Sequence, residues 1–236
     1  MPFGMLFDPT MILIIPGLIL TLWAQAKVKS AYSKYSQVRS RSGITGAQVA
    51  RDILNRAGLS RVTVESTPGE LTDHYDPRAG VLRLSEGVHN SQSIAALGIA
   101  AHEAGHAIQH GEHYGALVLR TAIAPAAATG SQLGIWIFMA GMLISLFAHT
   151  SMVWLLDIGI ILFSAGVVFT LITLPVEFNA SSRAIAILER GGYLTSDEIP
   201  EARAVLNAAA WTYVAAAATA VMMLVRLLIL RNMSRD

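Results

Sequence analysis

The sequence predicts an α+β integral membrane protein, with about four transmembrane helices and a small unit of helices and strands. The membrane part follows from composition, because 53% of the residues are hydrophobic and only 14% are charged, whereas a soluble domain carries about a quarter charged residues. The small unit follows from segments with amphipathic helix and strand patterns. We expect one membrane-embedded domain over residues 1–236, with the small unit at residues 27–127 and 175–205.

Four apolar stretches are long enough to cross a bilayer, which requires about 20 predominantly apolar residues in a helix. We place the spans near residues 7–26, 128–148, 152–174 and 206–230. The first span ends at Ala24-Gln25-Ala26, which resembles a signal cleavage site, but no Lys or Arg precedes it. Because a signal peptide begins with a basic segment, we expect an uncleaved anchor.

Basic residues predict the orientation of the spans. Those that follow the first span are Lys27, Lys29, Lys34, Arg39 and Arg41. No acidic residue precedes Asp52 there, so the positive-inside rule places this flank in the cytosol. Arg226, Arg231 and Arg235 would then lie outside, which argues for the opposite orientation. Because the first helix usually dominates, we expect a multi-pass protein of the plasma membrane with its small unit on the cytoplasmic side.

Charge and cysteine content exclude some partners and ligands. The net charge is +1 and no basic run is interleaved with aromatic residues, which argues against nucleic acid as a partner. The chain has no cysteine, so disulfides and thiolate zinc sites are excluded. Any zinc must therefore be held by histidines and carboxylates.

Two helices are expected in the small unit. Residues 44–58 are amphipathic and begin with a capping-box pattern, in which Thr45 is followed three residues later by a glutamine. A second, alanine-rich helix runs to about His110, with Ser91 or Ser93 as its N-cap.

Three strands are expected between these helices. Residues 61–66 alternate in the β manner, and residues 71–75 and 81–84 flank a turn at 76–80 that contains Pro and Gly. The last two strands therefore form a hairpin. The strand at 81–84 is the candidate edge strand for pairing with an extended substrate.

His102 and His106 stand four residues apart on the second predicted helix of the small unit. Residues at this spacing share a helix face, so the two imidazoles can bind one ion. Glu103, about 100° around the helix, is then free to act on a metal-bound water. Neutral imidazole suits Zn²⁺, and a glutamate at this position acts as general base. The pattern predicts a zincin-like catalytic unit.

A catalytic zinc takes a third protein ligand and keeps one position open for water. Glu177 follows the third predicted span, whereas His102 and His106 precede the second. Two crossings separate them, so the three side chains lie on one side of the membrane in either orientation. Glu177 is therefore the expected third ligand.

Other side chains remain as rivals to Glu177. His110 lies about 12 Å along the axis from His102 on a continuous helix, so it can join the ion only if the helix breaks. Glu112 and His113 follow the helix and stay open as ligands. Asp157, an acid in the third predicted span, lies near the opposite membrane surface.

Five stretches carry a family resemblance. They are Gly43–Ala47, Leu71–Arg78, Val81–Ser85, Ala100–Gln109 and Leu174–Ser181. Through them nearly the whole chain resembles the YugP-like membrane zinc metallopeptidases, the neutral zinc metallopeptidase family, which is distantly similar to the HtpX and CAAX-prenyl proteases. The combination is far more specific than the histidine motif alone.

The resemblance implies a gluzincin-like peptidase, with zinc held by His102, His106 and Glu177 and with Glu103 as the catalytic base. In the wider gluzincin pattern an Asp four residues after the ligand Glu orients a ligand His, and Ser181 stands at that place here. The resemblance therefore leaves open which groups orient the imidazoles.

Peptide hydrolysis also needs a hydrogen-bond donor that stabilises the developing oxyanion. His74 and Tyr75 on the hairpin are the catalytic candidates for this role, and a purely structural role for them stays open. The resulting hypothesis is a zinc-dependent membrane endopeptidase that meets its peptide or membrane-protein substrate at the lipid bilayer. The alternatives are a zinc-dependent amidase or hydrolase acting on a lipid-borne substrate and a non-catalytic, metal-stabilised membrane scaffold. Glu103 argues against the scaffold, because a structural zinc site needs no base.

Overall fold

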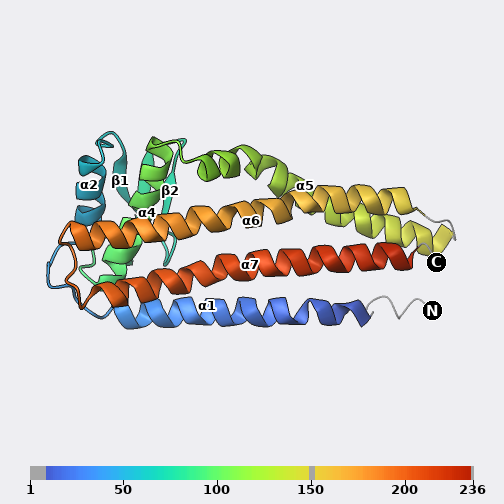
Figure 1. The fold of residues 1–236 in the computed structure, drawn as a ribbon, viewed down its shortest axis with the longest axis horizontal. Coiled ribbons are helices and arrows are strands. Elements are labelled where there is room, and N and C mark those ends of the chain that lie inside the picture. Colours follow the sequence, from blue (N-terminus) through green and yellow to red (C-terminus); the bar gives the residue numbers. More distant parts are fainter. Residues whose placement is uncertain (1–8, 149–151, 235–236) are drawn as a thin grey trace. The chain divides into compact units, whose positions relative to one another are not determined.

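Long helices make up most of the chain. The computed structural model describes residues 9–148 and 152–234. A short 3-10 helix, η2 (Pro9–Leu13), comes first among the described residues. Figure 1 labels the long helices that follow it. The long helices are α1 (Ile15–Tyr35), α5 (Gly115–Ala148), α6 (Val153–Arg190) and α7 (Ile199–Met233).

Four helical segments are long and apolar enough to cross a membrane. They are Pro9–Tyr35, Gly115–Phe147, Val153–Arg190 and Ile199–Met233. Together with the small sheet described below, they confirm the predicted α+β membrane protein. Helices α6 and α7 run past the predicted spans because their ends at residues 175–190 and 199–205 contain Ala, Arg and Glu, which form helices well. Residues 7 and 8 of the first predicted span lie outside the described residues.

The chain divides into two compact units. The membrane unit comprises Met1–Trp23, Leu119–Leu174 and Tyr213–Asp236, and the α+β unit comprises Ala24–Val118 and Pro175–Thr212. Each long helix therefore contributes residues to both units.

Within the membrane unit, α5 and α6 pack through small residues. A Cβ on Gly134 would lie 2.6 Å from the carbonyl oxygen of Gly159, and a Cβ on Gly159 would lie 2.8 Å from the backbone of Phe138. These glycines let the two backbones approach, as is common between membrane helices. Asp157 on α6 and Arg231 on α7 form an ion pair at 2.7 Å.

The short helices of the α+β unit begin where their capping residues predict. Helix α2 (Gly46–Arg56) opens with the predicted capping box, because Gln48 and Thr45 each bond the other's backbone N–H. Helix α4 (Ile94–Gly111) is capped by Ser93, whose Oγ accepts from the N–H of Ala96 at 3.2 Å. A one-turn helix that the sequence pattern did not predict, α3 (Glu86–His89), precedes α4.

Three strands form one mixed sheet in the order β1-β3-β2. Strand β1 (Thr63–Thr67) runs parallel to β3 (Val81–Ser85), and β2 (His74–Asp76) runs antiparallel to it. The predicted hairpin is therefore present, but the expectation that residues 81–84 form an edge strand is wrong. The turn at residues 76–80 predicts that β3 pairs with β2, but it does not predict whether another strand pairs with the other edge of β3. The edges are β1 and β2.

Helix α4 forms the centre of the core of the α+β unit. It is rich in alanine and lies against α2, the sheet and the part of α6 that belongs to this unit. The largest fully buried apolar side chains of this core include Leu54, Leu82, Leu84, Leu97 and Leu188. Because its neighbours enclose it, α4 holds its side chains in fixed positions.

Candidate metal centre

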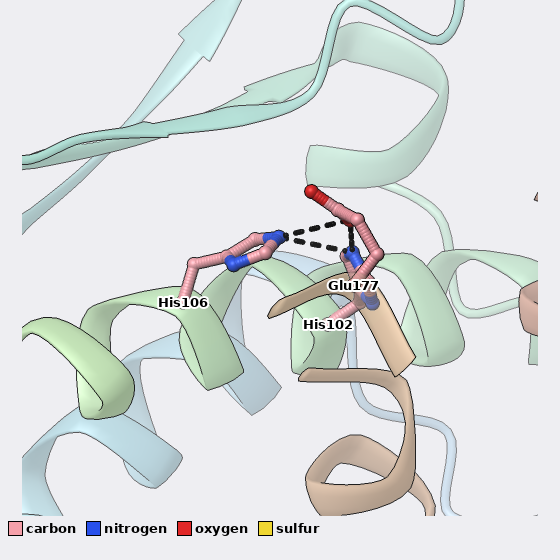
Figure 2. A group of neighbouring side chains, drawn as sticks. All are labelled: His102, His106 and Glu177. Atoms are coloured by element: carbon pink, nitrogen blue, oxygen red, sulfur yellow. Dashed lines mark hydrogen bonds and ion pairs between the residues drawn. The ribbon is translucent and has the colours of Figure 1, made fainter. Parts of the chain in front are cut away.

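The three predicted ligand side chains meet where α4 and α6 touch. In Figure 2 the imidazoles of His102 and His106 rise from α4, and the Glu177 side chain comes from α6 with its carboxylate directed toward them. Gly105 lies at this contact, since a Cβ there would lie 3.0 Å from the carbonyl oxygen of Ala180 on α6. The missing side chain of Gly105 lets α6 come close enough for Glu177 to reach both imidazoles.

The donor atoms of the three side chains converge. The Nε2 atoms of His102 and His106 are 3.1 Å apart. Oε2 of Glu177 lies 3.3 Å from Nε2 of His102 and 3.4 Å from Nε2 of His106 (Figure 2). Glu177 is only 2% exposed and His102 only 9% exposed. A carboxylate this deeply buried is costly unless a positive group accompanies it.

This donor set fits a zinc ion. Tetrahedral zinc with bonds of about 2.0–2.1 Å to nitrogen and oxygen places neighbouring ligand atoms about 3.3 Å apart. The three measured separations of 3.1, 3.3 and 3.4 Å are close to this value. Two imidazole nitrogens and one carboxylate oxygen are also ligands that zinc prefers, and three of them leave one position for water or substrate.

Each imidazole makes a further contact through its other nitrogen. Nδ1 of His102 lies 3.1 Å from Oγ of Ser181 on α6, and Nδ1 of His106 lies 3.0 Å from Oε1 of Gln109 on α4. Contacts of this kind orient ligand imidazoles. Ser181 thus contacts the candidate ligand His102 from the place where the gluzincin pattern has Asp. Gln109 was missed because a glutamine within an apolar helix gives no spacing signal.

The surroundings of His106 favour positive charge. Burial acts to lower the pKa of His106, but the hydrogen bond to Glu177 and the negative charges of Glu103 and Glu177 act against it, and the pKa is raised. Carboxylates near an imidazole stabilise its charged form in this way. The same negative charges would favour a metal cation.

Glu103 is buried on α4 but is not one of the three converging donors. Burial, assisted by the negative charge of Glu103, raises the pKa of Asp73, although hydrogen bonds from Ser85 oppose the shift. Asp73 accepts from the N–H of Ser85 at 2.8 Å and from its Oγ at 3.1 Å. The start of the hairpin therefore lies within electrostatic range of Glu103. Asp73 was not predicted as a site residue, although it belongs to a stretch that carried the family resemblance.

His74 and Tyr75 lie on β2 and outside the converging group. The His74 side chain is exposed, and its Nδ1 lies 2.8 Å from the carbonyl oxygen of Thr72. The Tyr75 hydroxyl lies 2.9 Å from Nδ1 of His110. Because His110 follows His106 by four residues on the same helix, Tyr75 is held over the histidine-bearing face of α4, one turn further along.

The rival ligands lie outside the converging group. Helix α4 continues unbroken past His110, so that imidazole stays a full turn beyond the cluster. Glu112 and Asp157 each form an ion pair with an arginine, and His113 lies in the turn after α4 with a φ of 53°. Among the described residues, the one group of metal-ligating side chains that converges within 4.8 Å is His102, His106 and Glu177.

Fold and site together define a multi-pass membrane protein with a candidate zinc centre. The model of the putative neutral zinc metallopeptidase family matches residues 10–232, and the chain belongs to this family. It is 50% identical over 224 residues to the putative membrane protease YugP of Bacillus subtilis (strain 168), an alignment that covers 95% of this chain and 97% of the relative. No solved structure matches the chain. The family and the relative both support a zinc protease of the membrane.

Proposed function

We propose that this protein is a zinc-dependent membrane endopeptidase that hydrolyses peptide bonds in peptide or membrane-protein substrates. One observation carries the proposal, namely the convergence of His102, His106 and Glu177 beside a buried glutamate on the same helix. Family membership supports the same reaction. A structural zinc site would have four protein ligands and no use for Glu103.

Each residue of the site has a separate role in the proposed hydrolysis. Zinc, when bound, would polarise the carbonyl group of the substrate and would lower the pKa of a water molecule to about 7. The Glu103 carboxylate accepts the proton that the attacking water loses and gives it to the amine nitrogen as the peptide C–N bond breaks. Ser181 and Gln109 hold the imidazoles of His102 and His106 in place while this happens.

Two features of β2 support a role in binding the substrate. It is an edge of the sheet, so an extended peptide can add to it through main-chain hydrogen bonds. Its residue Tyr75 places a hydroxyl above α4 through the contact with His110, which makes Tyr75 a better candidate than His74 for donating to the oxyanion. The ring of His74 instead faces Thr72.

The proton transfer is tested by replacing the base. Glu103→Gln removes the proton acceptor and leaves the three ligands intact, so zinc content should match that of the wild type while peptide hydrolysis falls by about 10²–10⁴-fold. Casein, a membrane protein and a lipid amide serve as substrates for the purified protein in detergent. Undiminished turnover by this variant would refute the role of Glu103, and cleavage of the lipid amide alone would identify an amidase.

The ligand set is tested separately. Glu177→Ala removes one of three ligands, so the protein should lose most of its zinc in competition with a chelator, because the two imidazoles alone hold the ion weakly. Metal content is measured directly and needs no substrate. A variant with full zinc content would exclude Glu177 and direct attention to Glu112 and His113.

We also propose that the α+β unit lies on the cytoplasmic side of the plasma membrane. The basic residues after the first span support this orientation. Four crossings then place the C-terminus on the outer side. Peptide products would be released into the cytoplasm.

The orientation can be tested with single cysteines because the chain contains none. Arg61→Cys labels an exposed position in the α+β unit, and Asn232→Cys labels an exposed position near the C-terminus. A membrane-impermeant maleimide added to intact cells should modify the Asn232 variant and spare the Arg61 variant until the cells are opened. The opposite pattern would place the metal centre outside.

A further inference from the structure

Gln109 is a polar side chain at the centre of the α4–α6 contact. It is fully buried, with 0% exposure. Its Oε1 lies 3.0 Å from Nδ1 of His106. Its Nε2 donates to the carbonyl oxygen of Val176 and to Oδ1 of Asn179, both at 2.9 Å. One amide group thus joins a candidate zinc ligand on α4 to two residues that flank Glu177 on α6.

These partners fix which way the amide of Gln109 points. The carbonyl of Val176 can only accept a hydrogen bond, so the atom of Gln109 that faces it must be the NH₂ group. Oδ1 of Asn179 accepts from Nε of Arg183 at 2.8 Å, and Arg Nε can only donate. Asn179 therefore presents oxygen to Gln109, which again requires the NH₂ group of Gln109 on that side.

The orientation of Gln109 decides where His106 carries its proton. With its NH₂ group turned to α6, Gln109 presents Oε1 to His106, and a carbonyl oxygen only accepts. Nδ1 of His106 must then be the donor. In the neutral ring this leaves a lone pair on Nε2, the atom that faces Nε2 of His102 and Oε2 of Glu177. This is the tautomer that binds a metal through Nε2.

His102 has no equivalent constraint. Its Nδ1 contacts the hydroxyl of Ser181, which can either donate or accept. The two imidazoles are thus held differently, one by an oriented amide and the other by a group that adapts to either tautomer.

The chain of contacts ends at the surface of the α+β unit. Arg183, which orients Asn179, also forms an ion pair with Glu112 at 2.7 Å. Gln109 lies on α4 and Glu112 is the C-cap residue of that helix, whereas Asn179 and Arg183 lie on α6. The connected side chains therefore bridge the two ligand-bearing helices twice, once in the interior and once at the surface.

We propose that Gln109, oriented by Asn179 and Arg183, is a positioning residue that holds His106 in its metal-binding tautomer and so sets the zinc affinity of the site. The inference rests on the proposed zinc centre. Unlike the proposed zinc centre, this inference assigns a function to groups that contact neither the ion nor the substrate.

The experiment measures zinc affinity by competition with a chromophoric chelator, on the full chain in detergent and without substrate. Gln109→Leu removes the acceptor, and affinity should fall by about 10–100-fold. Gln109→Glu keeps an oxygen toward His106 but turns its second oxygen toward the acceptors on Val176 and Asn179, so it should restore only part of the loss. The visible spectrum of the cobalt-substituted protein should change in the Leu variant and return toward that of the wild type in the Glu variant. Equal affinity of the wild type and the Leu variant overturns the proposal.

A second pair of variants remains informative if the Gln109 variants do not fold. Asn179→Asp keeps the oxygen that accepts from both Gln109 and Arg183, and it should bind zinc as the wild type does. Asn179→Leu removes that oxygen and should weaken binding by about 10-fold, within the range for residues that orient ligands. Equal affinity of the two variants contradicts the inference. If the wild type itself bound no zinc, the proposed function would fail first, so the two failures can be told apart.

Discussion

At the residue scale, the contact between His102 and Ser181 distinguishes this site from the gluzincin pattern. A serine hydroxyl carries no charge, whereas a carboxylate at the same place would polarise the imidazole and strengthen it as a ligand. The contact measures 3.1 Å. Ser181 therefore orients His102 without adding a second negative charge next to Glu177.

Replacing Ser181 should change zinc affinity in either direction, depending on the side chain introduced. Ser181→Ala leaves Nδ1 of His102 without this partner, and zinc affinity should fall by about 10-fold. Ser181→Asp should bind zinc at least as tightly as the wild type, because a carboxylate accepts the Nδ1 proton more strongly. Chelator competition measures both variants.

The neighbouring serine is the matched control for this prediction. Ser182 is exposed on the same helix, so Ser182→Ala should leave zinc affinity unchanged. If both alanine variants lost affinity equally, the effect would belong to α6 as a whole and not to the contact with His102.

Some residues of this site could be predicted from the sequence, and others could not. His102 and His106 were found because one helical turn separates them, and Glu177 was found because two membrane crossings return it to the same side. Gln109 and Asp73 could not be found in this way. Their importance depends on which neighbours the folded chain brings to a buried polar group, and spacing along the sequence does not report those neighbours.

At the element scale, the metal centre depends on how closely α4 and α6 approach. Gly105 allows the contact, with only 3.0 Å between the position of an added Cβ and the carbonyl oxygen of Ala180. That oxygen belongs to the backbone of a long helix and cannot move aside on its own. Any side chain at Gly105 must therefore push the two ligand-bearing helices apart.

Gly105→Ala should destabilise the α+β unit by about 1–3 kcal/mol, the usual cost of overpacking. It should also weaken zinc binding, because Glu177 moves away from both imidazoles. Thermal unfolding and chelator competition measure the two effects.

Gly98→Ala on the same helix is the control. A Cβ at Gly98 would lie 3.7 Å from Cβ of Ala202, an ordinary contact, and alanine favours a helix over glycine by up to about 1 kcal/mol. The variant should be at least as stable as the wild type. If Gly98→Ala and Gly105→Ala were equally destabilised, close packing at Gly105 would not be the cause.

The helices and strands of the α+β unit were largely predictable from the sequence, whereas the pairing of the strands in the sheet was not. The capping box at Thr45 and the turn between β2 and β3 are local patterns, and the structure has both. The parallel pairing of β1 with β3 joins strands that are not consecutive. The residues of β3 could not show that a second strand would cover the edge that we expected to be open.

At the scale of the whole molecule, one contact links the α6–α7 turn to α2 and makes stability depend on pH. The hydroxyl of Tyr193 donates to Asp52 at 2.6 Å, and Arg56 pairs with the same carboxylate at 2.9 Å. Burial and the hydrogen bond to Asp52 raise the pKa of Tyr193 to about 12. The hydrogen bonds from Tyr193 and Arg56 lower the pKa of Asp52.

These two pKa shifts affect the stability of the fold at opposite ends of the pH range. The pKa of Asp52 is lowered from 3.8, so its contribution to stability is present above that pH and is lost as the pH falls through the folded-state value. The pKa of Tyr193 is raised from 10.0 to about 12, so its contribution is present below pH 10 and is lost as the pH rises across that interval.

Tyr193→Phe should cost about 1 kcal/mol of unfolding free energy at neutral pH, the typical net value of one hydrogen bond. The difference from the wild type should shrink below about pH 4 and above about pH 10. Thermal unfolding in detergent, measured from below pH 4 to above pH 10, tests this difference. Tyr35→Phe serves as the control, because no hydrogen bond of the Tyr35 hydroxyl is present among the described residues, and it should follow the pH profile of the wild type. A constant difference at all pH values would show that Tyr193 acts through packing alone.

The division of the metal centre between α4 and α6 also has a consequence for biosynthesis. Translation proceeds from the N-terminus, so both histidines leave the ribosome well before Glu177 does. Two hydrophobic segments must enter the bilayer before the carboxylate can meet the imidazoles. A nascent chain released before Glu177 is synthesised therefore cannot assemble the complete candidate metal centre.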